Sequence, residues 1–320
     1  MNKAFKIALL GAVVLAAAFS LLHRSALHQP RETTTSTTAP EPRRSHPHIP
    51  IARTPIPLPA LPALATASVP ASVYPILVPT ASSSFAERVA QIHALKDLTA
   101  QELQALYGYL LSPSSAASER RQEENWLRND LMDKLTSQAA LPKDLVQVLV
   151  AVYQDSVQDV VMRDYAVQHM RPAYAQAPPE ERTVLQQALW NAVAETDGSI
   201  AGTALLALHD LARDFKEIDP DTLGEAALSL AGDGRCGELS RITAVQVCGR
   251  LGLKQAAPLL TQLVQDAPTV SLQIASIAAL GDVGDPAART YLQQLAGQAE
   301  PRLRPALQTA LNKLNKRNGT

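Results

Sequence analysis

A pattern that recurs about every 32 residues constrains the fold of this 320-residue chain more than any other feature. The stretch "VCGRLGLKQAAPLLTQLV" (247–264) lies over "ALGDVGDPAARTYLQQLA" (279–296) when the sequence is shifted by 32. The coinciding positions are glycine, small or apolar in both copies: Gly249 and Gly281, Gly252 and Gly284, Ala256 and Ala288, Leu260 and Leu292, and Leu263 and Leu295. Repetition at this period predicts stacked helical hairpins, because each hairpin buries the face that its neighbour leaves open.

A single copy shows how each hairpin is built. Apolar residues recur at helical spacing over 272–283. Gly284 can adopt the left-handed conformation that ends a helix without steric cost. Asp285 offers a carboxylate to the free N–H groups of the next helix, and Pro286 fits its first position. We expect Gly281 to keep the hairpin slim, so that its two helices approach closely.

These residues resemble the HEAT-repeat family, in the short bacterial version related to phycobilisome-lyase repeats. The resemblance is specific over 237–314 and looser over about 140–235. Arg241 matches the arginine typical of the first helix of the family's repeat, and Gln273 departs from it. The resemblance implies an α-solenoid with a groove that binds protein, and it implies no reaction. HEAT-like hydroxylases hold iron with His-Glu dipeptides, which this chain lacks.

The first 24 residues are expected to be a signal peptide or a signal-anchor helix. Residues 7–22 form an unbroken apolar run of 16, preceded by Lys3 and Lys6. A helix over 4–22 would contact the lipid bilayer if Lys6 extends its ammonium to the surface. Cleavage after Ala18 is the alternative. We therefore expect a single-pass inner-membrane protein with its C-terminal domain in the periplasm, or a periplasmic or secreted one after cleavage.

Residues 25–83 are expected to form a disordered linker rich in Pro, Ser and Thr, since 12 of the 23 prolines lie in 30–84. Capping boxes at Ser84 with Glu87 and at Thr99 with Glu102 then open a helical domain over 84–320. No stretch of that domain alternates as a strand would. The predicted fold class is all-α: a HEAT-like α-solenoid of stacked helical hairpins behind the anchor helix and the linker.

The charge balance argues against a nucleic-acid partner. Residues 1–84 hold seven Lys or Arg and two Asp or Glu, whereas residues 85–320 hold 22 and 28. Nucleic-acid-binding domains normally carry a basic stripe. The basic residues near the C-terminus are expected to belong to a solvated capping helix: Arg302, Arg304, Lys313, Lys316 and Arg317.

Candidate chemical sites are weak. His93, His169 and His209 are scattered singly, and His46 and His48 lie in the linker. The stretch "GDGRCG" (232–237) matches G-x-G-x-x-G but follows a helical segment, so it predicts a loop between repeats. Two groups of aspartates lack the spacing of a calcium loop and suggest solvated faces: Asp155, Asp159 and Asp164, and Asp210, Asp214, Asp219 and Asp221. We expect no catalytic residue, no cofactor and no metal.

The two cysteines are expected to be free thiols. If Gly237 caps a helix that runs through Cys248, then Cys236 lies roughly 15 Å from Cys248 at 1.5 Å per residue. A disulfide needs Cα atoms within about 7 Å. It stays the alternative, which requires that the helix begin later, near Ser240, and that "RCGEL" (235–239) fold back along it. We expect Cys248 to be buried, at the position of Leu280 in the next repeat, and Cys236 to be exposed in the preceding loop.

These features favour a non-catalytic scaffold that binds a protein or peptide in its solenoid groove. A lyase-type enzyme or enzyme accessory, by analogy with the repeat family, is one alternative, and a secreted binding module is another. The large side chains that would anchor a partner if they are exposed are Trp126, Trp190, Tyr153, Tyr165 and Tyr174.

Overall fold

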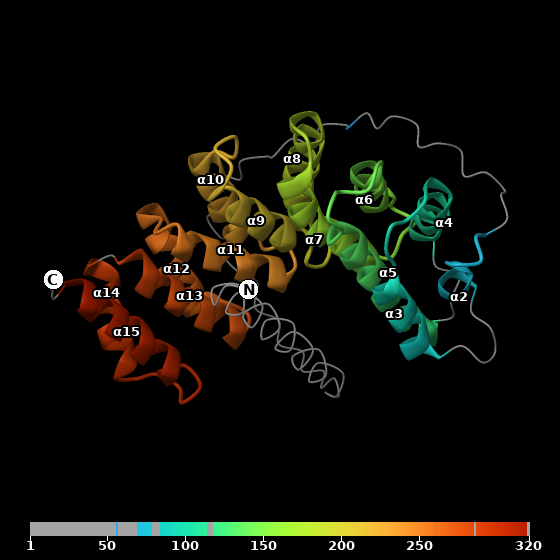
Figure 1. Ribbon diagram of the computed structural model, residues 1–320. Coiled ribbons are helices and arrows are strands. Elements are labelled where there is room, and N and C mark those ends of the chain that lie inside the picture. The colour runs from blue at the N-terminus through green and yellow to red at the C-terminus, as the bar shows by residue number, and fades with distance from the viewer. Residues whose placement is uncertain (1–55, 57–68, 79–83, 114–117, 285, 319–320) are drawn as a thin grey trace. The chain divides into compact units, whose positions relative to one another are not determined.

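The computed structural model describes residue 56 and residues 69–78, 84–113, 118–284 and 286–318. Over these ranges the regular structure is helical, with no strand (Figure 1). The predicted all-α domain is therefore confirmed for this part of the chain. The predicted signal or anchor helix (1–24) and Asp285 lie outside the described residues.

The helices form two rows. Those of the first row, the A helices, each pack against the next A helix along the chain: α3 (Phe85–Ala94), α5 (Ser118–Thr136), α7 (Val160–Gln176), α9 (Ile200–Leu211), α11 (Glu238–Arg250), α13 (Val270–Val283) and α15 (Arg304–Asn318). The B helices alternate with them in sequence: α4 (Ala100–Leu111), α6 (Leu145–Gln154), α8 (Pro179–Val193), α10 (Pro220–Gly232), α12 (Ala257–Asp266) after the 3-10 turn η1 (Lys254–Ala256), and α14 (Pro286–Ala296). This arrangement confirms the predicted stack of helical hairpins.

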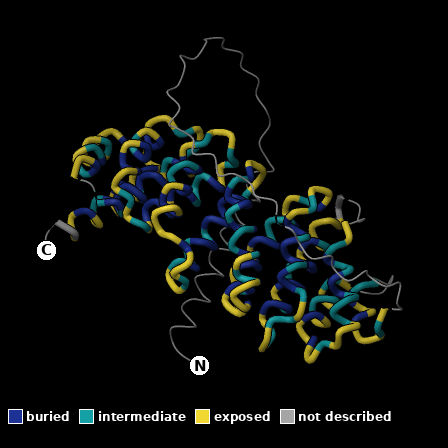
Figure 2. Tube along the Cα trace, turned by 90° about the horizontal axis from the view of Figure 1, so that it is seen from above, coloured by how far each residue is buried: buried dark blue, intermediate teal, exposed yellow. Residues whose placement is uncertain are grey.

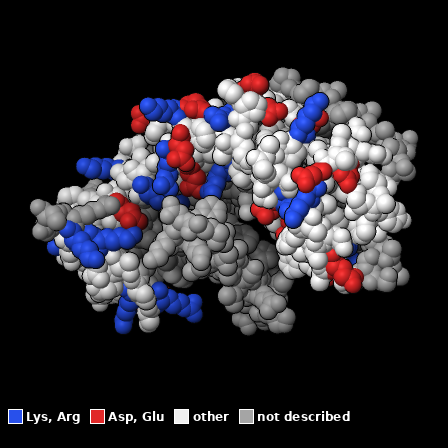
Figure 3. Space-filling model, viewed as in Figure 1, with Lys and Arg blue, Asp and Glu red and all other residues white. Residues whose placement is uncertain are grey.

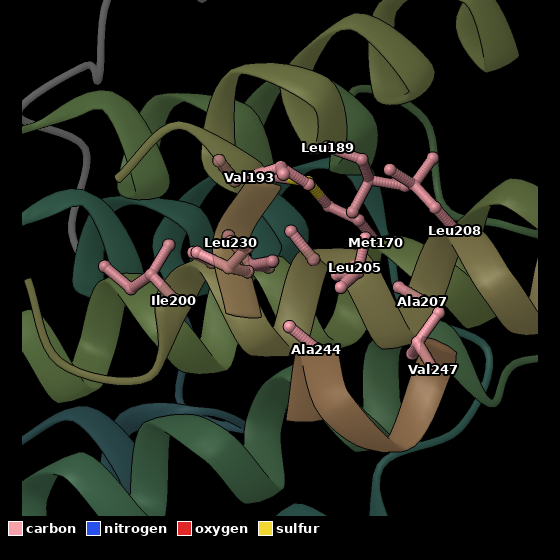
Figure 4. Close-up of a cluster of buried hydrophobic side chains, with 14 of the residues drawn as sticks. Met170, Leu189, Val193, Ile200, Leu205, Ala207, Leu208, Leu230, Ala244 and Val247 are labelled. Carbon is pink, nitrogen blue, oxygen red and sulfur yellow. The ribbon is translucent and has the colours of Figure 1, made fainter. Parts of the chain in front are cut away.

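Apolar side chains fill the space between the two rows. In Figure 2 buried residues follow the sides of the helices that face one another, and exposed residues follow the ends and outer faces. Figure 4 shows a part of this core in which Met170 of α7, Leu189 of α8 and Leu205 of α9 lie together. Burial of such side chains contributes about 1.5–3 kcal/mol each, so the core provides most of the stabilisation.

Several helix boundaries follow the caps that the sequence predicts. Ser84 and Glu87 form one capping box, and Thr99 and Glu102 form the other. Gly284 ends α13 with a φ of 75°, the left-handed conformation expected there. These caps satisfy backbone groups at the helix ends that would otherwise lack a partner.

Arginine at the fourth position of a helix ties that helix to the end of the helix before it. In each case Nε donates to a carbonyl oxygen of the last turn: Arg88 to Ile76 at 3.0 Å, Arg163 to Tyr153 at 2.8 Å, Arg182 to Tyr174 at 3.2 Å and Arg241 to Ala231 at 3.1 Å. Such carbonyls have no partner within their own helix. Gln273, which departs from the repeat pattern, occupies the same position of α13.

Glycine lets consecutive A helices approach at backbone distance. A Cβ atom built on the glycine would lie 2.8 Å from Cα of Ser240 at Gly202, 3.1 Å from Cα of Ala279 at Gly249, and 2.8 Å from Cα of Ala310 at Gly281. Gly281 thus faces α15 of the next repeat. The expectation that it narrows its own hairpin was wrong, because helical spacing defines a buried face without saying which neighbour lies against it.

A short helix, α2 (Tyr74–Leu77), falls inside the range 25–83 that the sequence predicts as linker. It packs against α3, and Val73 and Ile76 are fully buried in the core. The guanidinium of Arg88 donates to the Ile76 carbonyl from both Nε and a terminal nitrogen, at 3.0 and 2.7 Å. The packed part of the chain therefore includes residues before 84.

We expect Val73→Ala to lower the free energy of unfolding by about 1.5–2 kcal/mol, because two buried methylene equivalents are lost at about 0.8 kcal/mol each. Urea unfolding followed by circular dichroism measures this change. Tyr74→Ala is the matched control, since Tyr74 is 46% exposed on the same helix. If both variants unfold like the wild type, this segment does not contribute to the core.

Within the described ranges, no helix is both long and apolar enough to cross a membrane. This finding corrects the expected location, a single-pass inner-membrane protein with a periplasmic C-terminal domain. The apolar run 7–22 and the helix expected over 4–22 lie outside the described residues.

Candidate interaction surface

Two exposed and two half-buried side chains, all aromatic or apolar, form a group on three consecutive A helices. Trp126 of α5 is 45% exposed, and its ring centroid lies 6.3 Å from that of Phe85 of α3. Trp126 also lies beside Tyr165 of α7. Val161, which is 44% exposed, lies one turn before Tyr165. We call Phe85, Trp126, Val161 and Tyr165 the aromatic face.

The helices place these side chains outward by their phase. Leu127, Leu131 and Leu135 are fully buried and form the apolar stripe of α5, which leaves Trp126 on the outer side. Phe85 is the first residue of α3, directly after the capping box at Ser84. The aromatic face is therefore fixed by the same packing that builds the core.

A charged network beneath this face joins α2, α3, α4 and α5. Glu124 lies 3.4 Å from Arg88 of α3 and 3.6 Å from Arg128, four residues on in α5. Tyr109 of α4 donates its hydroxyl to Glu124 and lies under the Arg128 guanidinium, 4.7 Å from ring centroid to Cζ. The side chains of Arg88, Glu124 and Arg128 are 11%, 17% and 4% exposed. Burial raises the pKa of Tyr109, and the Glu124 carboxylate raises it further.

The electrostatics of the aromatic face are acidic. Burial raises the pKa of Asp130, with a smaller contribution from Asp133, although the neighbouring His93 acts in the opposite direction. Burial also raises the pKa of Tyr165, and the carboxylates of Asp164, Asp130 and Asp159 raise it further. Carboxylates therefore lie around the hydroxyl end of Tyr165.

The wider charge pattern is mixed. Figure 3 shows acidic and basic side chains interspersed over the visible face, with Lys and Arg gathered where α14 and α15 lie. Lys313 pairs with Asp282 at 2.7 Å, and Arg302, Arg304 and Lys316 are exposed. This part of the predicted C-terminal cluster is a solvated surface. The side chain of Arg317 lies outside the description.

The histidines do not come together as a site. His169 is buried between α7 and α5, where its Nε2 lies 3.0 Å from Oδ1 of Asn129, and burial lowers its pKa to about 4. His93 is exposed, and His209 lies 3.3 Å from Asp210. Within the described ranges, no three His, Cys, Asp or Glu side chains group as metal ligands would. His46 and His48 lie outside those ranges.

The "GDGRCG" stretch is the loop predicted between repeats. It joins the end of α10 at Gly232 to the cap of α11 at Gly237. Arg235 pairs there with Asp233 at 2.7 Å. An ion pair within the loop thus stabilises its conformation.

The aspartates that might have suggested calcium have local structural roles. Asp159 and Asp219 cap α7 and α10, and Asp155 accepts a hydrogen bond from the backbone of Val157. Asp164 accepts one from Ser199, and burial raises its pKa. Asp210 pairs with Arg171. The aspartates therefore stabilise helix ends and join neighbouring helices.

The other aromatic residues named from the sequence lie outside the aromatic face. Tyr153 is 3% exposed and Tyr174 is fully buried, and Trp190 is half-buried on α8, a B helix. The rings of Tyr174 and Phe215 meet edge to face, with centroids 5.0 Å apart, and Arg182 lies over both. Of the five candidates, only Trp126 and Tyr165 belong to the aromatic face.

Comparison with known proteins bears on the C-terminal repeats. Residues 237–312 match the HEAT repeats. A structure of human deoxyhypusine hydroxylase in complex with glycerol is similar at 18% sequence identity, with a TM-score of 0.31, and the likeness covers 77% of this chain and 95% of that one. A search of the curated proteins finds no match.

The HEAT-repeat match begins at the cap of α11 and reaches into α15. The aromatic face lies outside it, on α3, α5 and α7, which all end before residue 237. Sequence reasoning missed Phe85, Val161 and Asp130 as parts of this face. Asp130 could have been found, since it follows Trp126 by four residues and so lies on the same side of α5.

Both cysteines are free, as predicted. Cys248 is fully buried, as is Leu280 at the matching position of the next HEAT repeat. Cys236 is half-buried, which corrects the expectation that it is exposed. Burial raises the pKa of Cys236 to about 11, with Asp233 adding to the effect, and it raises the pKa of Cys248 to about 12.

We expect Cys236 to react about 100-fold more slowly at pH 8 than a thiol with the ordinary pKa of 9.0, because two pKa units lower the thiolate fraction about 100-fold. Ellman's reagent measures the rate, which should rise with pH up to about 11. Cys248 should react only after denaturation without reductant. Finding no free thiol in the denatured protein would establish a disulfide and contradict this arrangement.

Proposed function

We propose that this chain is a non-catalytic scaffold that binds another protein, and that the aromatic face is its principal contact surface. The observation that carries the proposal is the exposure of Trp126, a large apolar side chain held at 45% exposure between Phe85 and Tyr165. Tryptophan and tyrosine are enriched among the residues that contribute most to binding energy at protein interfaces.

The rigidity of the aromatic face supports its assignment as the contact surface. The Glu124 network and the buried leucines of α5 hold Trp126 and Phe85 in place, so little side-chain freedom is lost when a partner binds.

The proposal is tested by affinity capture with the full chain, followed by quantitative mass spectrometry. Three baits are compared: the wild type, Trp126→Ala, and Leu239→Ala as a matched control that removes an exposed apolar side chain from another A helix. We expect the wild type and Leu239→Ala to retain the same proteins and Trp126→Ala to lose them. Equal retention by all three baits would exclude the aromatic face as the contact surface.

A further inference from the structure

Resting on the proposed function, we infer that the segment recognised by the aromatic face is a cationic peptide, in which lysine or arginine alternates with apolar residues. The inference concerns the chemistry of the partner, so it can fail while the binding role of the face stands. Three features carry it: the unpaired carboxylates beside the face, their spacing along α5, and the exposed ring of Trp126.

The carboxylates beside the aromatic face lack lysine and arginine partners, although His93 lies near Asp130. Among the described residues, no Lys or Arg lies within ion-pair distance of Glu123, Asp130, Asp133 or Asp159, and Lys134 of the same helix pairs with none of them. Some other carboxylates on the surface do have such partners: Asp210 with Arg171, Asp233 with Arg235, and Asp282 with Lys313. The group on α5 differs from the remaining unpaired carboxylates because it shares one side of the helix with the exposed Trp126.

The carboxylates form a row along α5. Glu123 lies about one turn before Trp126, Asp130 one turn after it and Asp133 two turns after it, on the same side of the helix. From Glu123 to Asp133 the helix rises about 15 Å, which about four to five extended residues span. A short extended peptide can therefore lie along the whole row.

The apolar part of the face suits the same peptide. The ring of a tryptophan attracts a lysine or arginine cation more strongly than other aromatic rings do. Val161 and Tyr165 provide an apolar surface for the stems of such side chains or for the residues between them. An anionic segment, such as nucleic acid or a phosphorylated peptide, would be repelled by the carboxylates.

Three labelled 12-residue peptides test the inference by fluorescence anisotropy with the full chain. The cationic probe alternates arginine with leucine, the neutral probe has glutamine in place of arginine, and the acidic probe has glutamate. We expect the cationic probe to bind at least 10-fold more tightly than the neutral probe, with the difference shrinking as salt is added, and the acidic probe not to bind.

The double variant Asp130→Asn, Asp133→Asn should weaken binding of the cationic probe at least 10-fold and leave the neutral probe unchanged. The matched control is Asp221→Asn, Glu225→Gln, which neutralises two exposed carboxylates one turn apart on α10 and should change neither affinity. Circular dichroism confirms that both variants are folded. A cationic probe that binds both double variants like the wild type would overturn the inference.

Two other outcomes separate this inference from the proposed function. If the neutral and cationic probes bind equally and Trp126→Ala abolishes both, the face binds peptides but the cationic class is wrong. If no probe binds the wild type and Trp126→Ala captures the same proteins as the wild type, both proposals are wrong. Binding of the cationic probe only to Arg43→Gln, Arg44→Gln, Arg53→Gln would show that the occupant is the basic N-terminal segment of this chain, and would overturn the partner assignment.

Discussion

Replacing Leu280 with aspartate is expected to unfold the C-terminal repeats. Leu280 is fully buried in α13, which packs against α11 on one side and α15 on the other. A carboxylate at this position has no partner and must either lose its hydration or force the helices apart. The cost exceeds about 4 kcal/mol, the range reached only by the most disruptive substitutions. Circular dichroism at 222 nm should show helix loss at 25 °C together with a lower melting temperature.

The control for this experiment lies on the same helix. Ile274 is 37% exposed, so Ile274→Asp adds the same charge to α13 without burying it. We expect this variant to retain its helicity and to melt within about 3 °C of the wild type, since exposed substitutions usually change stability by less than about 0.5 kcal/mol. Equal behaviour of the two variants would contradict the burial of Leu280.

Glu124→Gln is expected to lower the free energy of unfolding by about 3–5 kcal/mol, the usual effect of removing one member of a buried ion pair. The carboxylate balances Arg88 and Arg128, whose side chains are only 11% and 4% exposed. Glutamine has nearly the same shape as glutamate and can still accept the hydrogen bond from Tyr109. The loss of stability therefore measures the effect of the charge alone. Urea unfolding gives the free energy, and a melting temperature lower by at least about 6 °C is expected for a chain of this size.

Glu123→Gln is the matched control, because Glu123 is the preceding residue of α5 and is exposed. It should unfold within about 0.5 kcal/mol of the wild type. If Glu124→Gln is as stable as Glu123→Gln, other groups compensate the positive charges of the two arginines. The network then does not hold α3 against α5.

Much of the fold could be predicted from the sequence, because the spacing of apolar residues shows which side of each helix is buried. The stripe of Leu127, Leu131 and Leu135, and the equivalence of Cys248 with Leu280, both follow from a period near 3.6 and a repeat near 32. Helix α2 could not be predicted in this way. Four residues are too few to show a period, and its burial depends on contacts with α3 that lie elsewhere in the sequence.

The candidate site was only partly predictable. Trp126 and Tyr165 could be named as large side chains, but exposure depends on which neighbouring helix covers them. Nothing in the sequence marks Phe85, the first residue of a helix, as part of the site, although it packs on Trp126 from a position 41 residues away. The acidity of the face was predictable in part, since Glu123, Asp130 and Asp133 share one side of α5 with Trp126, but the contribution of Asp159 and Asp164 depends on how α7 packs beside α5.

The close approach of the A helices at Gly202, Gly249 and Gly281 has a mechanical consequence. Backbones that already touch cannot be compressed, so the spacing between repeats is stiff along that row. Within the described residues, α10, α12 and α14 pack chiefly on A helices and make little contact with one another. We therefore expect the array to bend about this row of glycines, with the distances between neighbouring B helices changing more than those between neighbouring A helices.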